Sequence, residues 1–166
     1  FNPALDAANT IAPGVFLRQV KMFHIAADWQ AMRDSGFAEF DSLDFSTGLP
    51  AGLVLPYDRN HFIFDIAAVN QKNPERTTLR YYLHGFDNGW SPPTMSGIAS
   101  YPNLPAGDYI LYVKACNEDG VVGPGQELFR FRIRPPWWET TFARVVFVLL
   151  AILIIFRIIR FRERKL

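Results

Sequence analysis

The sequence predicts a mainly β protein: a β-sandwich followed by a single transmembrane α-helix. Two observations carry this prediction. Apolar residues alternate with polar ones in several short segments before residue 136, which is the pattern of half-buried strands. After residue 136 the chain becomes continuously apolar and then basic, as membrane-spanning helices do. With 166 residues, 49% of them hydrophobic and 20% charged, the chain holds one packed core and is not disordered.

Three segments show the strand pattern most clearly. In residues 61–68 (HFIFDIAA), every second residue from Phe62 to Ile66 is apolar and faces one side. Residues 108–117 (DYILYVKACN) repeat the pattern, and in residues 127–134 (ELFRFRIR) apolar residues alternate with arginine. Further strands are expected at residues 15–23, 52–55, 77–83 and 100–101, and turns at 88–89, 92–93, 105–107 and 118–120. Helical signals are nearly absent here, so we expect a sandwich of about six or seven strands.

The second part of the chain predicts a membrane span. Residues 145–156 (VVFVLLAILIIF) carry no polar side chain, and within residues 142–159 only Arg144 and Arg157 are charged. About 20 residues are needed to cross a bilayer, a length that is reached when flanking arginines snorkel. Trp137 and Trp138 precede the run as interface anchors. The basic residues that follow are Arg157, Arg160, Arg162, Arg164 and Lys165, which places the C-terminus in the cytoplasm. The alternative is a buried helix of a soluble protein, which the apolar character of every face disfavours.

The net charge of +1 hides an asymmetry along the chain. Residues 1–136 carry 11 Lys and Arg against 14 Asp and Glu, a charge of −3, whereas residues 137–166 carry +4. The single cysteine, Cys116, excludes an intrachain disulfide, so the core must hold the outer part together. No signal peptide is visible at the start, FNPALD, and the chain stops just after the apolar run. We therefore expect an internal piece of a longer, receptor-like protein.

No catalytic motif stands out in the sequence. Nucleophile elbows and phosphate-binding glycine loops are missing, and the three histidines are isolated. We expect no enzyme activity, no cofactor and no metal site. Residues 117–119 (Asn-Glu-Asp) lack the spacing of calcium loops and are interpreted as a turn. The stripe of Arg130, Arg132 and Arg134 is interpreted as a solvated strand face rather than a polyanion site, and no nucleic acid is expected as a partner.

A local motif narrows the sandwich to an immunoglobulin or fibronectin III-like type. In residues 103–120 a leucine and a Pro-Gly corner precede a tyrosine that opens a strand, and an Asn-x-x-Gly turn closes it. This order resembles the tyrosine corner of such domains, in which the hydroxyl group bonds back to the backbone a few residues upstream. Tyr109 would hold that place. The alternative is a tyrosine on an ordinary core face, and both interpretations lead to the same fold class.

Four motifs, in order, resemble the triple-tyrosine (three-Y) domain of bacterial two-component regulator and sensor proteins. They are residues 57–70 (YDRNHFIFDIAAVN), 80–90 (RYYLHGFDNGW), 101–120 (YPNLPAGDYILYVKACNEDG) and 133–140 (IRPPWWET), so the resemblance covers residues 50–140 approximately. The tyrosines that name the family would be Tyr81, Tyr101 and Tyr109, with Tyr82 on the opposite face. Val121 and Val122 depart from the aromatic residue that the family often has there. The motifs assign structural positions to Tyr81, Gly85, Trp90, Tyr101, Leu104, Gly107, Tyr109, Asn117 and Gly120.

The resemblance implies a non-catalytic part of a receptor in the bacterial inner membrane. Its N-terminal part would be periplasmic and its C-terminus cytoplasmic, with one pass between them. It would relay a ligand-induced change from an upstream β-propeller to a cytoplasmic output domain such as a histidine kinase. The resemblance also implies a homodimer and an oligosaccharide ligand bound elsewhere in the longer protein, with the lipid bilayer as a further partner. The alternative is a membrane-anchored adhesion or carbohydrate-binding sandwich without a signalling role.

The expected order of parts follows from these assignments. Residues 1–12 would end a preceding β-propeller or form a linker, and residues 13–136 would form the periplasmic sandwich. Residues 137–159 would form the transmembrane helix with its Trp-Trp anchor, and residues 160–166 would begin a cytoplasmic signalling helix. Two consecutive prolines, Pro135 and Pro136, restrict the backbone between sandwich and helix. A tilt of the sandwich should therefore reach the helix.

Overall fold

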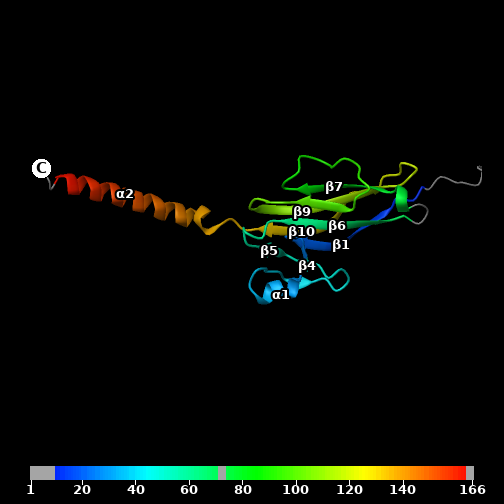
Figure 1. Cartoon of the computed structure of the whole chain (residues 1–166), viewed down its shortest axis with the longest axis horizontal. Helices are drawn as coiled ribbons and strands as arrows, with labels where there is room; N and C mark the ends of the chain where they lie inside the picture. Colours follow the sequence, from blue (N-terminus) through cyan, green and yellow to red (C-terminus); the bar gives the residue numbers. More distant parts are fainter. Residues whose placement is uncertain (1–9, 71–73, 164–166) are drawn as a thin grey trace, which may run out of the picture. The chain divides into compact units, whose positions relative to one another are not determined.

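The computed structural model describes residues 10–70 and 74–163. The chain divides into two compact units, Phe1–Arg134 and Pro135–Leu166, which are described separately (Figure 1). The described strands all lie in the first unit, and the long helix α2 lies in the second. Of the segment 1–12, expected to end a propeller or form a linker, residues 1–9 lie outside the described residues.

Two four-stranded sheets form the first unit. One has the order β2-β1-β6-β8, with bounds Ile25–Ala26, Gly14–Met22, Phe62–Val69 and Ile98–Tyr101, and its pairs are all antiparallel. The other has the order β5-β10-β9-β7, with bounds Leu53–Leu55, Gln126–Ile133, Gly107–Cys116 and Thr78–His84. Its β5–β10 pair is parallel and the others are antiparallel. A short hairpin pairs β3 (Ser42–Leu43) with β4 (Pro50–Ala51), and a 3-10 turn, η2 (Pro74–Arg76), precedes β7.

This strand order is that of an immunoglobulin-like β-sandwich, as the sequence predicts. β1, β6 and β8 lie where such domains have their first, second and fifth strands. β7, β9 and β10 lie where they have their third, sixth and seventh strands. Because β5 pairs in parallel with β10, the first strand of the fold is divided between the two sheets.

The core lies between the sheets. Phe62 and Phe64 on β6 and Phe129 and Phe131 on β10 are all buried. The ring centroids of Phe62 and Phe131 are 4.3 Å apart, and those of Phe64 and Phe129 are 6.0 Å apart. Buried and more exposed residues alternate along β6, β9 and β10, so the alternation that predicted these strands also predicted their buried faces.

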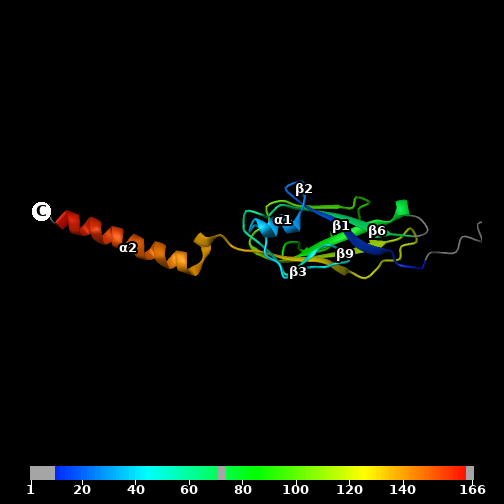
Figure 2. The ribbon, with the colours of Figure 1, turned by 90° about the horizontal axis from the view of Figure 1, so that it is seen from below.

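Residues 23–52 form an insertion between β1 and β5 that contains a helix, α1 (Trp29–Asp34). The helix lies with β4 at the lower side of the sandwich in Figure 1 and in front of the strands in Figure 2. Asp28 caps it by accepting a hydrogen bond from the Ala31 N–H at 3.0 Å, and Trp29 packs against the Phe129 ring at 5.9 Å. The outer part is nearly free of helix, as expected, but this one short helix was not predicted. Six residues with one buried side chain are too few to show a helical period in the sequence.

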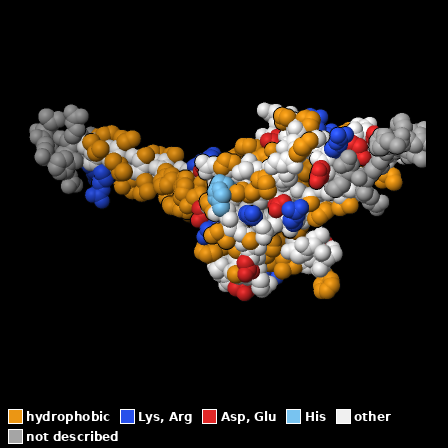
Figure 3. Space-filling model, turned by 45° about the vertical axis from the view of Figure 1, so that its right-hand side comes forward, with side chains coloured by type: hydrophobic (Ala, Val, Ile, Leu, Met, Phe, Trp, Pro, Cys, Tyr) orange, Lys and Arg blue, Asp and Glu red, His pale blue; other side chains and the backbone are white. Residues whose placement is uncertain are grey.

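The second unit consists of a 3-10 turn, η3 (Trp137–Glu139), and the helix α2 (Thr141–Glu163). Trp137 and Trp138 lie in the 3-10 turn with their rings perpendicular and 5.7 Å apart. The stretch Thr141–Arg160 is long and apolar enough to cross a membrane, with a mean hydropathy of 2.8. Figure 3 shows hydrophobic side chains covering this helix, with basic groups toward its end. Only 6% of the stretch is buried, so the unit does not have the packing of a soluble core helix.

Candidate functional site

Two of the three tyrosines predicted from the sequence meet at the open side of the sandwich. Tyr81 lies on β7 and Tyr101 on β8, and these strands are the edges of different sheets. The two rings pack edge to face, with centroids 6.2 Å apart and planes at 80°. Phe86, in the loop after β7, packs on Tyr101 in the same way at 5.9 Å. These three aromatic residues join the two sheets at a side where no strand of the described residues lies between β7 and β8.

Asp87 is the polar centre of this aromatic group. Its Oδ2 atom accepts hydrogen bonds from the Tyr101 hydroxyl at 2.7 Å and from the Leu83 N–H at 2.8 Å. Burial, followed by the hydrogen bond to Asp87, raises the pKa of the Tyr101 phenol above its ordinary value. Tyr101 therefore stays protonated and acts as a permanent donor to the carboxylate.

Ser91 joins the loop that follows β7 to the edge of that strand by hydrogen bonds. The Ser91 N–H donates to the Tyr81 carbonyl at 2.9 Å, and the Ser91 hydroxyl accepts from the Tyr81 N–H at 3.0 Å. Further along, Thr94 exchanges two backbone hydrogen bonds with Leu79. The loop thus satisfies the backbone groups of an otherwise open strand edge, which protects the edge from pairing with another chain.

A hollow of about 300 Å³ opens beside these residues. It is lined by Tyr81, Phe86, Asp87, Gly89, Ser91, Ser100, Tyr101 and Pro102. The lining supplies aromatic walls and one carboxylate, but no thiol, imidazole or amine. Its hydroxyl from Ser91 is engaged with the Pro92 carbonyl at 3.1 Å. The Asp87 carboxyl group and the Ser91 hydroxyl in this lining are thus both engaged in hydrogen bonds that hold the loop to the sheet edges.

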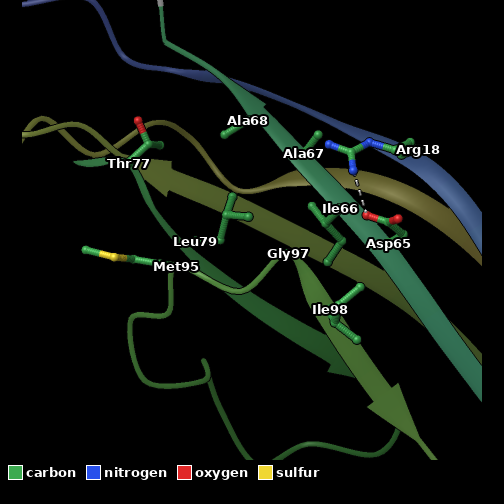
Figure 4. A pocket seen from close by; sticks show the side chains of 10 residues that line it. All are labelled: Arg18, Asp65, Ile66, Ala67, Ala68, Thr77, Leu79, Met95, Gly97 and Ile98. Carbon is green, nitrogen blue, oxygen red and sulfur yellow. Dashed lines mark ion pairs between the residues drawn. The ribbon is translucent and has the colours of Figure 1, made fainter. Parts of the chain in front are cut away.

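A second hollow of about 360 Å³ lies on the same open side, between β6 and the segment that enters β8 (Figure 4). Arg18 and Asp65 face each other there with N and O atoms 3.5 Å apart. The Ile66 N–H donates to the Gly97 carbonyl at 2.6 Å, which joins β6 to the segment that enters β8. A Cβ atom at Gly97 would collide with the Ile66 carbonyl, so only glycine allows this approach. Because the Arg18 side chain is 62% exposed, its ion pair with Asp65 is a weak surface contact.

The third predicted tyrosine, Tyr109, forms the tyrosine corner, and its ring packs on Phe131 rather than on Tyr81 or Tyr101. Its ring is buried and packs on Phe131 at 5.2 Å. Its hydroxyl donates to the Pro105 carbonyl at 2.6 Å, four residues upstream. Leu104 is buried beneath the corner, and a Cβ atom at Gly107 would lie 3.3 Å from the Tyr109 hydroxyl. The hydrogen bond that the sequence predicts for Tyr109 is confirmed.

The remaining motif residues occupy three other places. Gly85 has a φ of +94°, and a Cβ atom there would collide with the Asp108 carbonyl, so it sets the turn that presents Phe86 and Asp87. Trp90 lies on the outer face, under the Lys114 amine at 4.1 Å from the ring centroid. Asn117 closes a turn at the far end of β9 by accepting from the N–H groups of Asp119 and Val121 at 3.0 and 2.9 Å. Gly120 completes that turn with a φ of +82°. The nine residues therefore do not form one site.

The final strand is held by ion pairs along its outer face. The Arg134 guanidinium donates two hydrogen bonds to the Glu39 carboxylate, at 2.8 and 2.6 Å. The backbone N–H of Arg134 donates to the Leu55 carbonyl at 2.8 Å. Arg132 pairs with Asp108, and Arg130 with Glu127 at 3.0 Å. The hydrogen bond from Arg134 holds the pKa of Glu39 below its ordinary value. The arginine stripe is solvated, as expected, but each arginine already has an acidic partner.

Sequence reasoning missed the roles of Asp87, Ser91 and Glu39. The segment Asp87–Gly89 was expected only as a turn, and Glu39 lies 95 residues before Arg134. The one available signal was an acidic residue in a loop just after the Tyr-Tyr strand. Among the described residues no group of three or more metal-ligating side chains gathers, so no metal centre is assigned.

The fold and the tyrosine group define an immunoglobulin-like sandwich module joined to an apolar helix. Residues 70–134 match the family model of the Y_Y_Y domain, the triple-tyrosine domain that the sequence motifs resemble. The match begins just before β7 and ends with β10, and it contains Tyr81, Tyr101 and Tyr109.

Solved structures with this fold are extracellular domains of proteins from B. thetaiotaomicron. Two are of one protein assigned as a one component or hybrid two component system, with 22% identity and TM-scores of 0.55 and 0.57. A third is of another hybrid two component system, with 20% identity and a TM-score of 0.58. Each comparison covers 81% of this chain but only 17% of the solved domain, so the chain spans a small part of these proteins. No curated protein sequence matches the chain significantly.

Proposed function

We propose that this chain is the membrane-proximal module of a signal-transduction receptor, without catalytic activity of its own. It relays a change from a sensing part outside the membrane through one transmembrane helix to an output domain inside. The support is the Y_Y_Y domain at residues 70–134, the likeness to extracellular domains of two-component systems, and the apolar helix.

One observation carries the relay. The strand that leads out of the sandwich, β10, is an interior strand, paired with β5 on one side and β9 on the other. Its last residue, Ile133, is buried, and Arg134 is tied to Glu39 and to Leu55. The next residues are Pro135 and Pro136, whose φ angles are restricted. A displacement of the sandwich should therefore be transmitted to the helix, because little flexible backbone lies between them to absorb it.

The proposed orientation places the first unit in the periplasm and the C-terminus in the cytoplasm of the bacterial inner membrane. Its basis is the charge of +4 that residues 137–166 carry, concentrated after the apolar run. Arg157 and Arg160 are the first of these charges, and Arg144 near the other end would snorkel toward the headgroups. The tryptophans of η3 stand where aromatic anchors are most frequent.

The other proposed parts of the receptor lie outside this chain. An upstream β-propeller would bind the ligand, for which we propose an oligosaccharide, and a downstream output domain would carry the enzymatic step. The chain's 17% share of the solved domains leaves room for such parts. We further propose that two copies of the receptor pair, so that the ligand shifts a population between two arrangements of the dimer.

The relay is tested by inserting a flexible Gly-Ser segment after Pro136 in the full-length receptor. We expect output to lose its response to ligand while the protein still reaches the membrane, because the flexible segment absorbs the displacement. The matched control places the same segment between Ser46 and Thr47, in an exposed turn of the β3–β4 hairpin. A response that survives the first insertion as well as the second would refute the relay.

A carbohydrate-binding sandwich is the second candidate, and one surface favours it. On the outer face of β7 and β9, Tyr82 stacks on Tyr112 with ring centroids 6.4 Å apart and lies 5.8 Å from Trp90. Partly buried rings of this kind can stack on the apolar faces of sugars. Two results together would favour this candidate over the relay. The full chain would bind a glycan and lose this binding in Trp90→Ala, and the Gly-Ser insertion would leave the output unaffected.

A further inference from the structure

Exposed aromatic side chains gather at one end of the sandwich. We call it the proximal end: the end at which β10 finishes at Ile133, formed by residues 23–25, 35–38, 56–61, 85–87 and 102–106. The described residues of the first unit carry six exposed Phe and Tyr side chains, and four of them lie here: Phe23, Phe37, Tyr57 and Phe86. Ile25, which is 73% exposed, adds an aliphatic side chain. The other two, Phe16 and Phe45, stand singly elsewhere.

Ring contacts and hydrogen bonds join most of these segments into one surface. Arg59 places its guanidinium over the Phe37 ring, 4.4 Å from the centroid. Phe23 lies 5.6 Å from the His61 ring and its N–H bonds to the His61 carbonyl. Asn60 bonds to Asn103 through their side chains and to Leu104 through the backbone. The exposed aromatic groups are thus held by the fold rather than carried on loose loops.

The hairpin that carries Phe23 has an unfavourable backbone. Phe23 and His24 form the two-residue turn between β1 and β2, and their φ angles are +48° and +69°. Such turns favour Asn-Gly because both residues are left-handed, and a bulky side chain there is an outlier. Strain of this kind persists where a side chain has a purpose at that place. Here it presents an aromatic ring, 42% exposed, at the proximal end.

The proximal end carries Asp58 and Asp87 as well as Arg59, and of these charged side chains Arg59 points to the chemistry of the partner. Arg59 stacks on Phe37 but, within the described residues, forms no ion pair, whereas Arg130, Arg132 and Arg134 all do. A guanidinium group that is stacked on a ring and lacks a carboxylate is suited to bind a phosphate group. Aromatic rings and arginine stems together are the composition that prefers the boundary between water and lipid.

Chain length limits how far this end can lie from the membrane. Three residues, 134–136, separate Ile133 from Trp137, so these two Cα atoms lie within about 14 Å of each other. If Trp137 and Trp138 anchor at the interface, the end of β10 at Ile133 lies no more than about 14 Å from this anchor. The headgroup layer is itself about 5–8 Å deep on each side, so the proximal end can reach it.

We propose that the proximal end of the sandwich docks on the headgroup layer of the bilayer, with its aromatic rings at the interface and the Arg59 guanidinium on a lipid phosphate. The inference rests on the proposed function, because only a membrane-spanning α2 holds this end near the lipid. Docking would orient the sandwich on the membrane, so that a change upstream tilts it about a supported end.

Quenching in lipid nanodiscs tests this surface with the full chain. Single cysteines replace Ile25, Phe45 or Leu150 in a Cys116→Ser background, and each carries an environment-sensitive fluorophore. The discs contain phosphatidylethanolamine and phosphatidylglycerol, with spin labels placed either on a headgroup or on an acyl chain. Phe45 is the control, because it is a fully exposed aromatic residue that lies outside the proximal end. Leu150 reports the span itself.

We expect headgroup labels to quench the position-25 probe several-fold more than the position-45 probe, and acyl-chain labels to quench the position-150 probe. Phe37→Ser and Arg59→Gln should each reduce quenching at position 25, and Phe45→Ser should not. Equal quenching at positions 25 and 45, with position 150 quenched, would overturn the docking and leave the proposed function standing. Failure to quench position 150 would overturn both. Quenching at position 25 that depends on two copies per disc, and not on the lipid label, would assign the surface to a second copy and overturn the docking.

Discussion

The two units of this chain use the same apolar residue types in opposite ways. In the first unit, strands alternate, and side chains such as Phe62 and Leu111 are completely buried. In the second unit, the apolar residues of α2 occupy every face, and Leu150 and Ile154 are 50% and 56% exposed. The difference teaches that the first unit carries its own core, whereas the second requires a surrounding apolar solvent. Substitutions in the two units should therefore fail in different assays.

The largest effect is expected in the core of the sandwich. Phe62→Ala removes a buried ring that packs 4.3 Å from Phe131, and it should lower the free energy of unfolding by about 3–5 kcal/mol. Thermal and denaturant unfolding of the chain in detergent would measure this. Phe45→Ala is the control, because that ring is fully exposed and its removal should change stability little. Equal losses from both variants would contradict the assigned core.

The counterpart in the second unit is a charge at the centre of the apolar helix. Leu150→Arg should cost about 2.5–3.5 kcal/mol of membrane insertion, while leaving the unfolding of the sandwich unchanged. Alkaline extraction of membranes, together with the melting curve of the sandwich, would separate the two effects. If the variant instead melted the sandwich, α2 would be acting as part of its core.

These two units also differ in how far sequence reasoning reached. The apolar run and the alternating strands were predictable because burial on one face, or on all faces, imposes a period that a single sequence displays. Tyr109 was predictable because its hydrogen bond to Pro105 is local. The insertion with α1 was not, since six residues show no period. The contacts of Asp87 with Tyr101 and of Glu39 with Arg134 join separate elements, and only the folded chain brings these residues together.

A smaller loss is expected at the turn that presents Asp87. Gly85→Ala would force a Cβ atom toward the Asp108 carbonyl in a left-handed backbone, at a cost of about 1–3 kcal/mol. Gly89→Ala in the same loop meets no atom within 4 Å and should be nearly neutral. Unfolding midpoints of the two variants measure the difference. Similar midpoints would show that the turn adapts without strain.

Removal of a single hydroxyl group should matter less. Tyr109→Phe leaves the Pro105 carbonyl without its 2.6 Å donor at a buried corner, so a loss of about 1 kcal/mol is expected. Tyr82→Phe is the matched control, because its hydroxyl lies on the outer face near His84 at a longer distance of 3.3 Å. Denaturant titrations of both variants would resolve the two. A larger loss of stability from Tyr82→Phe would contradict the structural role assigned to Tyr109 and assign it to Tyr82 on the outer face.

The smallest effect lies at the boundary between the two units, where Arg134 holds Glu39. The hydrogen bond from Arg134 lowers the pKa of Glu39 below its ordinary value of 4.5. A carboxyl group whose folded-state pKa is lowered stabilises the fold above the ordinary pKa, and this contribution is lost as the pH falls through the folded-state pKa. The melting temperature of the native chain should therefore fall more than that of Glu39→Gln as the solution is acidified below 4.5. Because the pair is fully exposed, the difference should be small and should shrink further at high salt.

Asp44 provides the comparison that identifies the cause. Its pKa is lowered by hydrogen bonds from Ser46 and Thr47 rather than by a cation. Asp44→Asn should therefore show an acid-dependent difference from the native chain that salt leaves in place, while the Glu39→Gln difference fades. If salt affected neither difference, the Glu39–Arg134 pair would act through its hydrogen bonds alone. The hydrogen bonds between Arg134 and Glu39 would then stabilise the end of β10, and acidification would weaken them only when Glu39 takes up a proton.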